Sequence, residues 1–194
     1  TWLAMRAEDP EAVVRALRLR TVLPANWASG LAQAATEGVF VTPPVDGWIL
    51  VFGRDLAVTT HNPAEMEALL TGLSEQYGEV MWFSTDEVRD VHGWAMAERG
   101  QFLRGYAYDE GQGHTLWHGD VTAAETALGC FLDDPRDQSD DEIKWWPDRR
   151  TVLAIAAAWS MDPTKIGSEA TRGANGGDRS GVRSGASAGL LGRL

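Results

Sequence analysis

Apolar residues recur at helical spacing in five stretches of the chain, and most of these stretches begin at a residue type that caps helices. The clearest stretch begins with Asn62-Pro63-Ala64-Glu65, which has the form of a capping box, and it ends at Gly78. Similar start signals predict four further helices, which begin at Asp9, Asn26, Thr122 and Pro147.

Short apolar or alternating runs between these helices predict strands. The runs cover 2–6, 39–41, 48–52, 80–84, 92–98, 101–108 and 115–117. Arg99-Gly100 separates two of the longest runs, as expected of a hairpin turn. Because hairpins outnumber crossovers, we expect an α+β fold with a mainly antiparallel or mixed sheet of about six or seven strands, backed by about five helices.

Both periodicities vanish from residue 167 onward, where Gly, Ser and Arg dominate the composition. Such a composition buries too little apolar area to offset the entropy of ordering the chain. The sequence therefore predicts a single acidic globular domain over 1–166 and a flexible tail over 167–194. The tail has a short apolar end that contains Leu190, Leu191 and Leu194.

The charge of the chain narrows the possible partners. The formal net charge is −11. The tail carries about +2 and the body about −13, and such a body attracts basic partners rather than phosphates. We therefore expect a protein partner and no nucleic acid. No apolar run approaches the ~20 residues of a membrane span, and the single cysteine, Cys130, permits no internal disulfide. These features fit a cytoplasmic protein with no membrane partner.

Three short motifs match functional signatures only in part. Residues 104–108 resemble the opening of an RNA-recognition signature, but Asp109, Glu110 and Gly111 stand where that signature continues with an apolar residue and another aromatic. Residues 185–189 spell a nucleophile elbow without the strand and helix that the motif needs. His114 and His118 flank the predicted strand over 115–117, in a segment that reads as strand or turn, and four strand steps separate two rings by about 13 Å. We therefore predict no catalytic residue, no metal ligand and no cofactor.

The strand over 101–108 carries the strongest candidate binding surface. Alternation places four large side chains on one face, and a tryptophan of the neighbouring strand completes the candidate set: Trp94, Phe102, Arg104, Tyr106 and Tyr108. If this face is exposed, it suits stacking on a partner. The alternative is that the aromatic face belongs to the core and Arg104 lies near an edge.

Two classes of function follow from these observations. The first is a non-enzymatic interaction module whose acidic body binds a macromolecular partner, for example a basic toxin or nuclease that an immunity-like protein neutralises. In a version of this class, the leucines of the tail dock the protein to a larger assembly. The alternative is a small-ligand-binding protein or an enzyme with a site on the 90–108 hairpin, assembled from Asp90, His92, Glu98, Arg104 and Tyr106.

Overall fold

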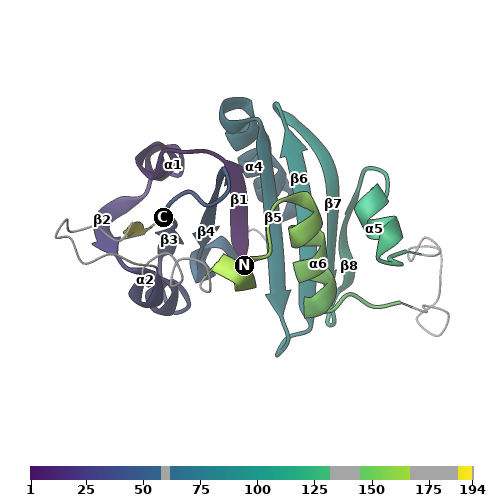
Figure 1. Ribbon diagram of the computed structural model, residues 1–194. Coiled ribbons are helices and arrows are strands. Elements are labelled where there is room, and N and C mark those ends of the chain that lie inside the picture. Colours follow the sequence, from purple (N-terminus) through teal and green to yellow (C-terminus); the bar gives the residue numbers. More distant parts are fainter. Residues whose placement is uncertain (58–61, 132–144, 167–187, 194) are drawn as a thin grey trace, which may run out of the picture.

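Nine strands of the computed structural model form one antiparallel sheet in the order β2-β9-β3-β4-β1-β5-β6-β7-β8 (Figure 1). The structure describes residues 1–57, 62–131, 145–166 and 188–193. In chain order, the strands are β1 (Trp2–Arg6), β2 (Arg20–Ala25), β3 (Val39–Val41), β4 (Trp48–Phe52), β5 (Glu79–Asp86), β6 (Val91–Glu98), β7 (Gln101–Asp109), β8 (Gly113–His118) and β9 (Gly189–Arg193).

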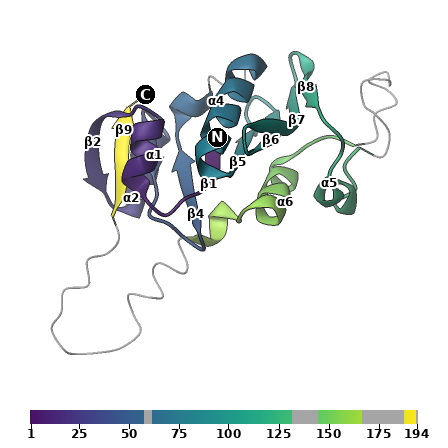
Figure 2. The same ribbon diagram turned by 90° about the horizontal axis from the view of Figure 1, so that it is seen from above.

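Helices cover both faces of this sheet (Figure 2). The described residues contain the α-helices α1 (Pro10–Ala16), α2 (Trp27–Ala34), α4 (Pro63–Tyr77), α5 (Ala123–Ala127) and α6 (Arg149–Trp159), with short 3-10 helices η1 (Arg54–Ala57) and η3 (Pro163–Lys165). The side chains of Asp9, Asn26, Asn62, Thr122 and Asp148 each accept a hydrogen bond from the first turn of a helix, as capping residues do. The helix starts predicted from Asp9, Asn26, Asn62 and Thr122 are therefore confirmed, whereas the fifth helix, predicted to begin at Pro147, begins at Arg149 after the cap Asp148.

Two hydrophobic cores lie on opposite faces of the sheet. Neighbouring residues of β1 alternate between them: Leu3 and Met5 pack in the core under α1 and α4, whereas Trp2 and Ala4 pack in the core under α6. The helix α2 lies on the same face as α6, and its Trp27 packs against Phe40 of β3 with ring centroids 5.8 Å apart. The strand β1 therefore supplies side chains to both layers of helices.

The predicted α+β class and antiparallel sheet are confirmed, but the sheet has nine strands rather than six or seven. The two strands that the sequence pattern missed, β2 and β9, lie side by side. Pro24 interrupts the first, and Gly189 and Gly192 dilute the second, so neither shows a strong strand signal. No helix in the described ranges is long and apolar enough to span a membrane.

The flexible tail expected over 167–194 needs correction at its apolar end. Residues 189–193 form β9 and pair with both β2 and β3, since backbone pairing and not composition decides their conformation. Residues 167–187 and Leu194 lie outside the described residues.

Candidate functional site

The residues of the predicted aromatic surface lie in the sheet under α5 and α6. Trp94, Arg104, Tyr106 and Tyr108 all belong to this face, and none is more than 8% exposed. Phe102 lies on the opposite face, because Leu103 is an extra residue in β7 where its pairing with β6 shifts by one. These side chains therefore belong to the two cores rather than to an exposed surface.

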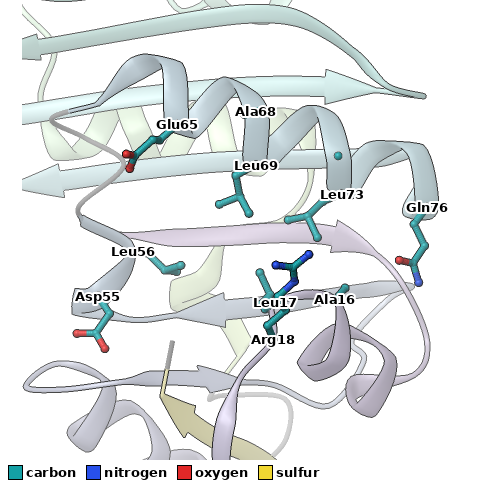
Figure 3. Close-up of a pocket in the computed structure, with 11 residues that line it drawn as sticks. Ala16, Leu17, Arg18, Asp55, Leu56, Glu65, Ala68, Leu69, Leu73 and Gln76 are labelled. Atoms are coloured by element: carbon teal, nitrogen blue, oxygen red, sulfur yellow. The ribbon is translucent and has the colours of Figure 1, made fainter.

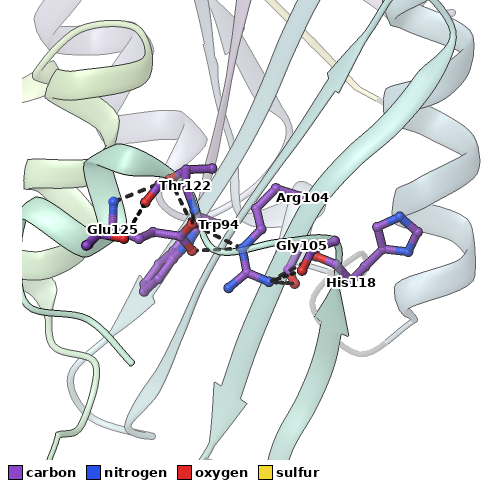
Figure 4. A network of polar contacts seen from close by, with 8 residues as sticks. Trp94, Arg104, Gly105, His118, Thr122 and Glu125 are labelled. Carbon is purple, nitrogen blue, oxygen red and sulfur yellow. Dashed lines mark hydrogen bonds and ion pairs between the residues drawn. The ribbon is translucent and has the colours of Figure 1, made fainter. Parts of the chain in front are cut away.

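The carboxylate of Glu125 is the centre of a buried polar network (Figure 4). It accepts hydrogen bonds from Nε1 of Trp94 at 2.7 Å, from Nε of Arg104 at 2.9 Å, and from the backbone N–H and hydroxyl of Thr122 at 2.7 and 2.8 Å. Glu125 and Arg104 are 0% and 1% exposed, so the ion pair between them is fully removed from water. The capping box that starts α5 thereby ties this helix to β6 and β7.

Arg104 is also held by carbonyls and by aromatic rings. Its Nη1 donates to the carbonyl oxygen of His118 at 2.9 Å, and its guanidinium carbon lies 4.7 Å from the centre of the Trp117 ring. Its Nη2 has no hydrogen-bond partner among the described residues. Such a network fixes how β7, β8 and α5 pack.

Burial suppresses the ionisation of two neighbouring groups, the Cys130 thiol and the Tyr106 hydroxyl. Burial, followed by the negative charge of Glu125, raises the pKa of the Cys130 thiol to about 12. Burial likewise raises the pKa of the Tyr106 hydroxyl well above its ordinary value, and a 3.2 Å hydrogen bond joins this hydroxyl to Nδ1 of His114. Cys130 is thus a buried apolar group that stays protonated at neutral pH.

His92 forms a second polar arrangement on the same face of the sheet. Its Nε2 lies 2.9 Å from Oδ1 of Asp90, and its Nδ1 lies 3.0 Å from Oγ1 of Thr85. In the tautomer of the ring that donates from Nε2 to the Asp90 carboxylate, Nδ1 accepts from the Thr85 hydroxyl. The order hydroxyl, imidazole, carboxylate is the order found where a histidine activates a nucleophile.

The remaining candidates of the 90–108 hairpin do not converge with this pair. Glu98 forms an ion pair with Arg99 at the turn, while Arg104 and Tyr106 contact Glu125 and His114. Leu190 and Leu191 are half-buried in β9, and Leu194 is outside the described residues. Across the part of the chain that the structure describes, no group of three or more His, Cys, Asp or Glu side chains could hold a metal ion.

A groove opens on the opposite face of the sheet, between α1, η1 and α4, and we call it the α1–α4 groove (Figure 3). Its volume is about 690 Å³, within the size range of small-molecule and peptide sites. Four leucines from three elements form its apolar surface: Leu17, Leu56, Leu69 and Leu73. Three of them are less than 8% exposed, and Leu69 is half-buried, so it is the most exposed of the four.

Charged side chains lie at defined places around this groove. Asp55 and Glu65 approach the same end of it from η1 and α4, and Arg18 points from the end of α1 toward α4 (Figure 3). Asp55 accepts a 3.0 Å hydrogen bond from the backbone N–H of Gly38, whereas no ion pair joins Arg18 or Glu65 to another described side chain. The groove therefore offers an apolar floor, an acidic end and a separate cation.

Sequence reasoning missed this groove because its leucines have the spacing of ordinary core positions. Leu17, Leu69 and Leu73 lie on the apolar stripes that predict α1 and α4. The stripe shows that these side chains face inward. It does not show that α1 and α4 leave a groove between them in which the leucines are not covered by the other helix. The positive φ of Arg18, 54°, turns the chain sharply after α1.

Comparisons of the chain with models of protein families, with curated proteins and with solved structures found no match.

Proposed function

We propose that the protein is a non-enzymatic interaction module that holds an apolar, basic segment of a partner protein in the α1–α4 groove. The observation that carries this proposal is a groove with a leucine floor, on which Leu69 is the most exposed leucine, and with two carboxylates, Asp55 and Glu65, at one end. Apolar anchors supply most of the affinity of such an interface, and charges at the rim supply orientation and rate.

The charge of the whole chain supports the same kind of partner. A formal net charge of −11 attracts a basic protein over a distance that salt shortens to about 8–10 Å. An amphipathic helix laid into the groove would place apolar side chains on Leu69 and a basic side chain near Glu65. A basic toxin or nuclease, neutralised in the manner of an immunity protein, is the specific partner class that this chemistry fits.

The test uses a fluorescent synthetic helical peptide of leucine and lysine, with a leucine and glutamate peptide of the same pattern as its counterpart. We expect fluorescence anisotropy to show that the lysine peptide binds and that the glutamate peptide does not. Leu69→Asp places a charge on the apolar floor and should weaken binding at least tenfold. Val88→Asp is the matched control, because Val88 is 95% exposed and lies outside the groove.

A second pair of variants tests the acidic end. Glu65 lines the groove and Glu67 does not, although both are exposed residues of α4. Glu65→Gln should weaken the lysine peptide by up to about fivefold, the range of an exposed ion pair, whereas Glu67→Gln should change little. Equal effects of the two glutamine variants, or binding that Leu69→Asp leaves intact, would remove the groove from the proposal.

A second candidate function is an enzyme that uses the row Thr85, His92 and Asp90. It is favoured by the hydrogen bonds of 3.0 and 2.9 Å that place the imidazole between a hydroxyl and a carboxylate. Hydrolysis of a nitrophenyl ester is the assay. In this reading, His92→Ala and Thr85→Ala abolish turnover and Thr85→Ser retains it; turnover that survives in Thr85→Ala excludes the row as its source.

A further inference from the structure

We infer that β9 is an exchangeable strand, and that the slot between β2 and β3 also accepts residues 189–193 of a second copy of this chain. The slot is separate from the α1–α4 groove, so this inference does not rest on the proposed function. Figure 2 shows β9 beside β2 at one end of the sheet, and in the sheet order β3 is its neighbour on the other side.

The slot requires a strand. β9 pairs antiparallel with β2 on one side and with β3 on the other, with Leu191 opposite both Leu23 and Phe40. In the sheet order, β2 is the edge strand and β9 is its one neighbour. Removing β9 would therefore leave β2 without a strand partner and expose the backbone donors and acceptors of β3, which is unfavourable for both.

The side chains of β9 hold it only weakly in comparison. Gly189 and Gly192 have none, and Leu190 and Leu191 are half-buried. The ion pair between Arg193 and Glu37 is 3.0 Å long, but its side chains are 64% and 54% exposed, and such pairs contribute little. The backbone pairing that remains is the same whichever copy of the chain supplies the strand.

The fit of β9 to its slot is nevertheless selective. A Cβ atom added at Gly189 would collide with the Phe40 ring and lie 2.6 Å from the carbonyl oxygen of Val41. A Cβ added at Gly192 would lie 3.0 Å from Cβ of Leu19. The slot therefore favours a strand with small residues at both positions, and a second copy of this chain supplies that strand by identity.

The chain can reach a neighbouring copy. Residues 167–188 connect Ile166, after η3, to Gly189. A connection of this length spans up to about 70 Å when extended, well beyond the radius of gyration of roughly 15 Å for a domain of this size. Exchange of an identical element replaces every contact of β9 by its equal, so it forms dimers with little change in free energy except that of association.

The test uses two single-cysteine proteins, both with Cys130→Ala. One carries Leu23→Cys in β2, the other Leu191→Cys in β9, and these positions lie directly opposite each other. The two proteins are unfolded in urea, refolded together over a range of concentrations and then oxidised. We expect a disulfide-linked heterodimer whose fraction rises with concentration, because the two cysteines meet only when β9 of one copy occupies the slot of the other.

The matched control is Glu79→Cys mixed with Glu98→Cys. These residues also lie opposite each other and are 43% and 37% exposed, but their strands, β5 and β6, are consecutive and lie inside the sheet. A chain that carries both Leu23→Cys and Leu191→Cys shows whether this pair can form a disulfide at all. The inference is wrong if that chain closes its internal disulfide while the mixed proteins stay monomeric, or if the control pair forms heterodimers equally well.

Discussion

Replacing Glu125 by glutamine removes the negative charge at the centre of the buried network. The carboxylate accepts from three residues, Trp94, Arg104 and Thr122, and it is fully buried. Glutamine keeps one acceptor oxygen, but its amide donors face groups that are themselves donors. Removing one partner of a buried ion pair costs about 3–5 kcal/mol, and we expect a loss of that size here. A natural domain has only about 5–15 kcal/mol of stability in total.

Equilibrium unfolding in urea, followed by tryptophan fluorescence, measures this loss as a lower midpoint at an unchanged slope. Glu79→Gln is the matched control: its partner Arg6 is 3.1 Å away, but the pair is 49% and 43% exposed, so its loss should cost less than about 1 kcal/mol.

A double variant separates the charge from the packing. Arg104→Met with Glu125→Met removes both charges and should recover about 2 kcal/mol or more relative to the sum of the single changes. A stabilising buried ion pair is contradicted if Glu125→Gln costs no more than Glu79→Gln, or if the two methionine substitutions are additive.

Three further predictions concern single positions. Because the pKa of Cys130 is raised to about 12, iodoacetamide at pH 8 should label this thiol only after urea unfolds the protein; rapid labelling of the native protein would contradict its burial. Burial alone would raise the pKa of Asp148, but hydrogen bonds from Thr151 outweigh it and lower the pKa. Asp148→Ala should therefore lower the free energy of unfolding by about 1 kcal/mol at pH 7. This loss of stability should shrink as the pH falls below about 4, through the folded-state pKa of Asp148. Urea titrations that show a constant loss down to pH 2 would refute this. Gly189→Ala should destabilise the protein and speed hydrogen exchange in β2. As the control, Gly72→Ala adds a Cβ that meets nothing within 4 Å and should stabilise the protein by about 0.5–1 kcal/mol. Equal effects of the two changes would refute the collision at Gly189.

The helices of this fold were predictable because their signals are local. Asn62 and Gly78 bound α4 through contacts within a few residues, and Thr122 with Glu125 shows the start of α5 in four letters. The same local pattern could not show that the Glu125 carboxylate also binds Arg104, which lies 21 positions earlier in the chain. Only the packing of α5 on β7 brings these two side chains together.

The strand β7 shows how one residue defeats a periodic pattern. Strict alternation places Phe102 with Tyr106, but the extra residue Leu103 sends them to opposite faces. A bulge of this kind depends on how β7 pairs with β6, so it could not be predicted from residues 101–108 alone. The sequence also could not show whether the aromatic face is exposed or buried, because it is α5 and α6 that cover this face.

The position of β9 also determines when the sheet can be completed during synthesis. β2 leaves the ribosome about 160 residues before the strand that joins it to β3, which at ordinary elongation rates is an interval of roughly 8–30 s. Within that interval β3 to β8 are made and can pair with one another and with β1, while β2 has no neighbour to pair with until β9 emerges. A nascent chain therefore carries an unfinished end of its sheet, and this end is where a chaperone would be needed and where misassembly between neighbouring nascent chains would begin.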